Sequence, residues 1–430
     1  SLVQKAGSAT GAVFSQISGP LTMTGGTIAI SNTSTYTDRR FTVTGNASLT
    51  GGAVTTTVAG SRLDLRGADN TLTPASFAPG ISVGLQATGS QSLLTGVSFG
   101  NQFILSGNNA VKTVTANSPG LSIGSVVLQD SDGTTPASRT TLKLGSNLST
   151  GTSQLPYVIS FSNVGESGRV DVGIDADRYT LDMSTTSGTW LPNYTSQAGI
   201  TNTVWTLSGT AGTIKATAFN FSSSGTSGYA TTNVGPGLVL NAVGGNGTGS
   251  ILTGTGTIDP SSVFRYSGTA SPTTPATLGA NRPVGDVEVT SGALRISYFT
   301  SGQVLRVSGG ASADLNGGAR SFAGGQLIDG SIANGTLTGG TAGVTVQSGT
   351  VSATISGATL VTKTGSGTVV LSGSSTYTGG TTLSGGTLAL SGGSNRLPTT
   401  GTVTLGGTST LAINAVSQSV ATLTTSDASS

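Results

Sequence analysis

Apolar and polar residues alternate with a period of two in residues 360–413. Leu388 and Leu390 alternate with small or polar neighbours, and the same pattern recurs at Val403 and Leu405. A period of two places successive side chains on opposite faces of a β-strand, one of which is buried. We therefore expect this stretch to form short strands, separated by glycine-containing turns.

These apolar pairs are too short for strands of a large independent sheet. They have the length of one side of a coil in a stacked β-solenoid, where neighbouring coils supply the missing hydrogen bonds. The pattern therefore predicts an all-β chain folded as an elongated parallel β-solenoid, or β-helix, which we expect to be right-handed. Coils of about 20–23 residues, stacked ~4.8 Å apart, would carry Leu, Ile and Val inside and Thr and Ser outside.

Several motifs in the same stretch resemble a known repeat. They are Lys363-Thr-Gly-Ser-Gly-Thr, Leu371, Tyr377-Thr-Gly-Gly-Thr-Thr and Gly385-Gly-Thr-Leu. Together they resemble the autotransporter-associated β-strand repeat, also called the passenger-associated transport repeat, with a looser similarity as far as Leu423. Such repeats occur in secreted or surface-displayed bacterial β-helices. The resemblance thus implies an exported, extended structural protein with an extracellular or cell-surface location, and it implies no catalytic residues.

The chain also repeats itself over long distances. Residues 2–10 align with residues 360–368, and residues 25–31 lie 360 positions before the similar residues 385–391. Residues 291–297 form a third, more diverged copy. Residues 42–44 keep the same offset of 360 positions from residues 402–404. A conserved offset across two segments is difficult to obtain by chance, so we interpret these segments as true internal repeats.

The middle of the chain differs from its ends because it contains both tryptophans, Trp190 and Trp205, and many of the tyrosines and phenylalanines. The sequence therefore predicts N-terminal solenoid coils at 1–147, an aromatic-rich, less regular β region or insertion at 148–237, and C-terminal coils at 238–430, with the clearest repeat at 360–423. Wider coils with larger core residues would explain the aromatic residues, and a ligand-binding lobe is the alternative.

Composition excludes several classes of function. Charged residues make up 8% of the chain, the net charge is +2, and the basic residues form no run, so a nucleic-acid partner is not expected. The chain contains neither Cys nor His, which removes Cys/His zinc sites, thiol chemistry and any Ser-His-Asp nucleophile. Apolar runs are too short to span a membrane.

Two acidic segments are candidates for chemistry. Five of the 16 acidic residues lie close together with two arginines: Glu166, Asp171, Asp175, Asp177, Asp182, Arg169 and Arg178. Strand alternation would place Asp171, Asp175 and Asp177 on one face, as in a glycosidase carboxylate site. Exposed cross-strand ion pairs are the simpler interpretation.

The second segment, Asp130-Ser-Asp-Gly133, begins like a calcium loop but lacks the distant bidentate Glu of an EF-hand, and Asp and Gly are common turn residues. We predict no catalytic residues, no cofactor and no metal site.

The two ends predict self-assembly. Both end modules share a sequence, and the end strands of a solenoid expose unpaired backbone groups. We therefore expect the chain to polymerise head to tail. The residues expected at this contact are Leu2, Val3, Ile28, Ile30, Leu411 and Ile413.

The sequence thus predicts a structural protein rather than an enzyme. An extracellular fibre or surface-layer subunit is the first hypothesis. The passenger domain of an autotransporter-like adhesin, from which a barrel has been removed, is the alternative, and a polysaccharide-degrading β-helix enzyme is a distant third. Besides other copies of the chain, a cell surface or a polysaccharide is the expected partner.

Overall fold

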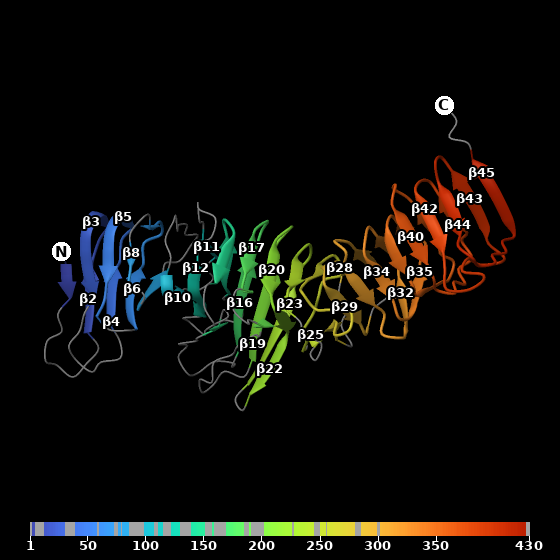
Figure 1. Cartoon of the computed structure of the whole chain (residues 1–430). Helices are drawn as coiled ribbons and strands as arrows, with labels where there is room; N and C mark the ends of the chain where they lie inside the picture. Colours follow the sequence, from blue (N-terminus) through green and yellow to red (C-terminus); the bar gives the residue numbers. More distant parts are fainter. Residues whose placement is uncertain are drawn as a thin grey trace. The chain divides into compact units, whose positions relative to one another are not determined.

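The computed structural model shows an all-β protein (Figure 1). It describes residues 2–4, 13–30, 39–57, 60–72, 76–78, 80–85, 99–106, 111–114, 122–129, 139–150, 157–158, 169–184, 189–190, 202–225, 228–244, 250–254, 256–279, 285–298 and 302–426. Among these residues, no helix is long and apolar enough to cross a membrane. Nearly all strand pairs are parallel, which confirms the predicted parallel β-solenoid; its handedness stays a prediction.

The chain divides into two compact units. Unit 1 comprises Ser1–Leu238 and Gly254–Thr257, and unit 2 comprises Val239–Thr253 and Ile258–Ser430. These units do not test the expected division into three regions with boundaries at 147 and 237, which stays a prediction.

Unit 1 contains three long series of paired strands. The first series is β2 (Val13–Ile17), β4 (Arg39–Val43), β6 (Ser61–Leu65), β9 (Ile81–Leu85), β10 (Phe99–Ser106), β12 (Ser122–Gln129), β14 (Leu148–Thr150) with β15 (Tyr157–Val158), β17 (Thr180–Asp182) and β20 (Thr213–Ala216). The second series is β1 (Leu2–Gln4), β3 (Leu21–Ile30) and β5 (Ala47–Thr55), with β7 (Thr71–Leu72) and β8 (Ser76–Phe77) both beside β5.

The third series of unit 1 is β11 (Val111–Val114), β13 (Arg139–Leu144), β16 (Arg169–Asp175), β19 (Asn202–Ser208) and β23 (Gly228–Val234). It ends on β22 (Ser222–Gly225), which pairs with β23 in the antiparallel direction. A shorter pair joins β18 (Thr189–Trp190) to β21 (Ala218–Asn220). Each strand therefore bonds to the strand of the next coil, as a solenoid requires.

Unit 2 has the same organisation. Its first series is β24 (Val239–Ala242), β26 (Val263–Ser267), β28 (Asp286–Ser291), β30 (Val304–Val307), β33 (Gly324–Leu327), β36 (Val344–Val346), β39 (Val361–Lys363), β41 (Thr381–Leu383), β43 (Thr402–Gly406) and β45 (Thr422–Ser426). The second is β25 (Ser250–Thr253), β27 (Ala276–Leu278), β29 (Ala293–Ile296), β31 (Ser312–Asp314), β34 (Ser331–Ala333), β37 (Gly349–Val351), β40 (Thr368–Leu371), β42 (Thr387–Leu390) and β44 (Thr410–Ile413). The third is β32 (Ala319–Phe322), β35 (Thr336–Gly339) and β38 (Thr354–Ser356).

Coil length differs along the chain. In unit 2, Val361 lies beside Thr381 and Thr381 beside Val403, offsets of 20 and 22 positions that match the expected coil length. In unit 1, Leu142 lies beside Ile174, an offset of 32 positions. Nearer the N-terminus of unit 1, Arg39 lies beside Ser61 and Ser61 beside Ile81, offsets of only 22 and 20 positions. The coil at Leu142 therefore has longer connections between its strands than these coils do.

The three internal repeats share one local conformation. The glycine at the second position of each, Gly26, Gly292 and Gly386, has a φ of 82°, 64° and 64°. These positive values favour glycine because a Cβ atom strains this backbone region. Strands β29 and β42 begin directly after Gly292 and Gly386, whereas Gly26 lies within β3; the two aliphatic residues that follow are buried in each repeat, as at Leu294 and Ile296. In each repeat the glycine therefore precedes residues that present their apolar side chains to the core.

Large aromatic residues occupy the core of unit 1. Trp205, Phe219 and Phe221 have no exposed surface, and the rings of the two phenylalanines meet edge to face with centroids 6.1 Å apart. No larger aromatic cluster occurs among the described residues. Strands β16 and β19 pair over seven residues in this region. The expected irregular, aromatic-rich middle is therefore not confirmed.

Candidate functional site

Part of the acidic cluster predicted near residue 175 makes a backbone turn. The Asp175 Oδ1 atom accepts a hydrogen bond from the Asp177 backbone N–H at 2.9 Å, and Asp177 has a φ of 47°. Asp177 lies beyond the end of β16, so strand alternation does not extend to it and does not align it with Asp175. The side chains of Asp171 and Arg169, and all of Glu166, lie outside the described residues, as do Asp130 and Asp132.

Asp182 links two neighbouring strands. Its Oδ1 atom accepts hydrogen bonds from the backbone N–H and the hydroxyl of Ser184 at 2.9 and 2.6 Å, and its Oδ2 atom lies 2.7 Å from Lys215 Nζ. Partial burial raises the pKa of this carboxyl, but the hydrogen bonds from Lys215 and Ser184 outweigh burial and lower it overall. The contact is a cross-strand ion pair between β17 and β20. No group of three potential metal ligands occurs in the described part of the chain.

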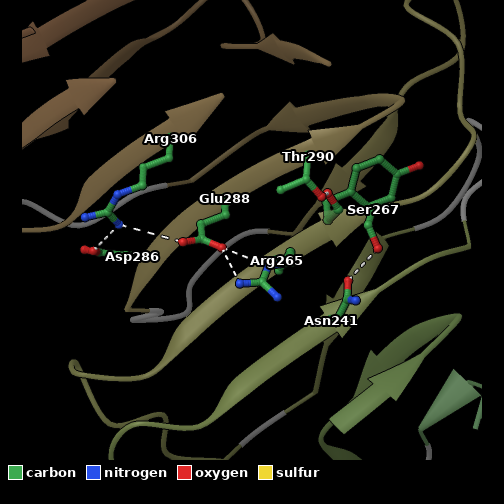
Figure 2. Close-up of polar contacts among 8 residues, drawn as sticks. Asn241, Arg265, Ser267, Asp286, Glu288, Thr290 and Arg306 are labelled. Atoms are coloured by element: carbon green, nitrogen blue, oxygen red, sulfur yellow. Dashed lines mark hydrogen bonds and ion pairs between the residues drawn. The ribbon is translucent and has the colours of Figure 1, made fainter. Parts of the chain in front are cut away.

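A row of polar side chains runs along the outward face of unit 2 (Figure 2). Asn241, Arg265, Glu288 and Arg306 occupy the same register position in β24, β26, β28 and β30. The Glu288 Oε2 atom lies 2.8 Å from Arg265, and Glu288 Oε1 lies 4.0 Å from Arg306. Arg306 also binds Asp286 Oδ2 at 2.7 Å. We name these five residues the polar row.

The polar row is balanced in charge. Two guanidinium groups face two carboxylates, and all four charged side chains are half-buried. Asp286 Oδ1 additionally accepts the backbone N–H of Val304 at 2.9 Å, which ties the row to the next strand. Because each charge already has a partner of opposite sign, this row fits cross-coil stabilisation better than the binding of a charged ligand. Because these pairs remain partly open to solvent, each is expected to stabilise the fold by at most about 1 kcal/mol.

Threonines continue the same register position beyond the polar row. Gln326 follows Arg306 and leads to a column of five threonines, Thr345, Thr362, Thr382, Thr404 and Thr424. The last two hydroxyls are 3.0 Å apart. This column confirms the expected outward threonines, and the column itself carries no charge.

Lys363 occupies an inward position. It lies in the core column between Val346 of β36 and Leu383 of β41, and it has no exposed surface. Its ammonium donates hydrogen bonds to the carbonyl oxygens of Thr364, Gly365 and Gly385 at 2.6, 3.0 and 3.1 Å. Burial lowers the pKa of this ammonium. A lysine thus occupies a position that neighbouring coils fill with an aliphatic residue, and backbone carbonyl oxygens accept the hydrogen bonds of its ammonium group.

Tyr377 fills another part of the same coil. It is fully buried, and its hydroxyl lies 2.6 Å from the hydroxyl of Thr381, which is also buried. Burial raises the pKa of Tyr377 to about 12, although the hydrogen bond to Thr381 acts in the opposite direction. These two motif residues therefore have a structural role in the core.

A buried ion pair lies in unit 1. Arg62 and Asp64 of β6 are in contact through Nε and Oδ1, and Asp64 has no exposed surface. Burial raises the pKa of Asp64, while the nearby Arg62, Arg40 and Arg66 oppose this shift. The pair extends over Gly84 of the next strand, where a Cβ atom would collide with the Asp64 carboxylate.

The residues predicted for assembly are placed differently at the two ends. Ile28 and Ile30 are buried in β3, between β1 and β5, and Leu2 pairs with Ile28. In unit 2, Leu411 is half-buried and Ile413 is 48% exposed. Val3 pairs with Ala29. Ile28 and Ile30 therefore belong to the core of unit 1, and an assembly role for the six residues stays a prediction.

Sequence reasoning missed the polar row and the buried lysine. The row was hidden because its members are 24, 23 and 18 positions apart, an uneven spacing that no fixed period detects. The burial of Lys363 had a signal, since alternation places it on the same face as Val361. That signal was overlooked because lysine is seldom buried in a protein core.

Comparison with known proteins identifies the C-terminal repeat. Residues 361–390 match the family model of the passenger-associated-transport-repeat. This is the stretch that contains Lys363, Tyr377 and strands β39–β42, and it is the repeat expected from the sequence. The chain matched none of the curated proteins and none of the solved structures with which it was compared.

Proposed function

We propose that this chain is part of the passenger domain of an autotransporter-like bacterial protein, displayed at the cell surface or secreted, and that it acts as a non-catalytic scaffold or adhesin. One observation carries the proposal: the segment that matches the passenger-associated-transport-repeat is built directly into the parallel solenoid of unit 2. The match and the fold thus point to the same kind of protein.

The adhesin passenger replaces the fibre or surface-layer subunit as the preferred hypothesis. The repeat match supports a passenger, whereas neither the fold nor the comparisons support a fibre subunit. Head-to-tail self-association, and binding to a cell surface or a polysaccharide, remain proposals for the partners of this chain.

A catalytic role has little support from the acidic residues. Asp175 and Asp182, two of the residues first considered for a carboxylate site, accept local hydrogen bonds that make turns, and Asp182 is also paired with Lys215. A glycosidase needs two carboxyl groups that face a substrate across a defined gap. We therefore propose that the protein is not an enzyme.

Surface display can be tested in the bacterium that produces the protein. Intact cells would be treated with a protease, and the chain followed with an antibody, with a periplasmic protein as the control for cell integrity. We expect the chain to be degraded, or found in the medium, while the periplasmic control survives. If the chain survives on intact cells and fractionates with cytoplasmic proteins, the proposal is wrong.

Sedimentation of the purified chain separates the passenger from the fibre hypothesis. A monomer at high concentration is expected for a passenger, and a concentration-dependent series of larger species for a head-to-tail polymer. Incubation with a panel of polysaccharides would test the enzyme hypothesis, for which release of shorter saccharides is the positive result.

A further inference from the structure

Lys363 is an exception among the inward residues of unit 2. The column in which it lies otherwise contains Val346, Leu383 and Leu405. An ammonium in such a column is unfavourable unless its hydrogen bonds are satisfied. An aliphatic residue would fill the position without that cost, so the lysine needs a separate explanation.

The three acceptors of Lys363 provide that explanation, because they belong to two coils. Thr364 and Gly365 follow Lys363 in its own coil, whereas Gly385 lies in the turn of the next coil, before β42. Three ammonium hydrogens thus meet three carbonyl oxygens. Each of these carbonyl oxygens thus accepts a hydrogen bond from Lys363. One side chain therefore supplies hydrogen bonds to backbone carbonyls in the turns of two consecutive coils.

Gly386 makes room for this contact. It has a φ of 64°, and a Cβ atom there would lie 2.7 Å from Lys363 Nζ and 2.6 Å from the Gly365 carbonyl oxygen. Only a residue without a side chain allows the second turn to approach the ammonium so closely. The lysine and the Gly-Gly turn 22 positions later are thus complementary parts of one contact.

We infer that Lys363 is an interlock between two coils, which makes the turn at 364–367 and the turn at 384–387 open and close as one cooperative unit. Opening either turn removes acceptors from a buried ammonium and so disfavours the closed state of the other. Backbone bonds run in parallel with this contact, since Ser384 N–H donates to Lys363 O at 2.8 Å and Thr387 N–H donates to Gly367 O at 3.1 Å. These two amides report directly on the state of the interlock.

Hydrogen exchange with the Lys363→Met variant tests the interlock. Methionine keeps an unbranched apolar stem but donates no hydrogen bond, so three carbonyls lose their donor. We expect the amides of Ser384 and Thr387 to exchange about ten- to a hundredfold faster, the loss that corresponds to a charge-assisted hydrogen bond. The amide of Thr350 donates to Gly330 O, two coils before the bond between Thr387 and Gly367, and its exchange should be unchanged.

The control variant is Leu383→Met, which changes the neighbouring residue of the same column without touching a polar contact. It should accelerate the same two amides far less than Lys363→Met does. If Lys363→Met leaves their exchange unchanged or slows it, the lysine is a dispensable core residue and the inference is wrong. Equal acceleration by both variants leads to the same conclusion.

Chemical labelling of the unmodified chain gives a second test, which does not depend on the folding of a variant. An amine-acylating reagent should modify Lys215, whose side chain is 31% exposed, at least about a hundredfold faster than Lys363. Labelling of Lys363 should follow the exchange rate of the Thr387 amide as temperature rises. A labelling rate for Lys363 close to that for Lys215 would show that the turns at 364–367 and 384–387 are open, and would overturn the inference.

Discussion

The core column that contains Leu390 makes a quantitative prediction possible. Leu390 has no exposed surface and lies in β42, between Leu371 of β40 and Ile413 of β44. Thr387 lies at the start of the same strand, half-buried on the outward side, between Thr368 and Thr410. The same substitution, to aspartate, can thus be made on the inner and outer sides of one strand.

Leu390→Asp should be severely destabilising. Removing a fully buried leucine side chain costs about 2–5 kcal/mol, as in a change to alanine. The new carboxyl group adds a desolvation cost, or is held protonated at about 1.4 kcal/mol for each unit by which its pKa rises. Thr387→Asp, which leaves the core intact, should change the free energy of unfolding by only about 0.5 kcal/mol.

Chemical denaturation, monitored by circular dichroism, would measure the free energy of unfolding of both variants. Leu390→Ala is a third variant, which separates the lost packing from the added charge. Because a solenoid can unfold in parts, hydrogen exchange should be used to locate the loss. We expect it in β40, β42 and β44 first. Equal losses for Leu390→Asp and Thr387→Asp would refute the assignment of the inner and outer faces.

Three further outcomes are expected. The pKa of Tyr377 in the folded chain, about 12, lies above its ordinary value of 10.0, so the unfolded chain loses this proton first as pH rises. The free energy of unfolding should therefore fall between pH 10 and 12. Denaturation curves of Tyr377→Phe should lack this pH dependence. Gly84→Ala should destabilise unit 1 by about 1–3 kcal/mol because its Cβ atom meets the Asp64 carboxylate. Gly25→Ala is the control, and it should have a small effect because no atom lies within 4 Å of the new Cβ atom. A comparable loss of stability for the two variants would contradict the packing at Gly84. Treatment with EDTA should leave the melting temperature unchanged, and a large decrease would reveal a metal site.

Strand patterning predicted the fold because it depends on local chemistry. Leu388 and Leu390 had to share a face once they formed a strand, and both are buried. The glycine at 386 marked the turn for the same reason, since a positive φ favours that residue. Coil length near the C-terminus followed from the spacing of such strands.

Other features depended on contacts between residues distant in sequence. The offset of 32 positions between Leu142 and Ile174 could not be predicted, because long connections have no periodic pattern. Asp177 was expected in a strand, but the chain turns there with a positive φ, so alternation did not apply. The partner of Lys363 at Gly385 could not be identified before the stacking of the two coils was known.

The pairing of each strand with one strand before it and one after it also bears on how such a chain can change over evolution. Thr382 lies beside Thr362 on one side and Thr404 on the other, and the three positions are chemically equivalent. Tandem duplication or loss of one whole coil therefore leaves the remaining coils with neighbours of the same kind. Insertion of a single residue within a strand instead exchanges its inner and outer faces. The gene can thus lengthen or shorten in steps of one coil, while changes of one residue are confined to the turns.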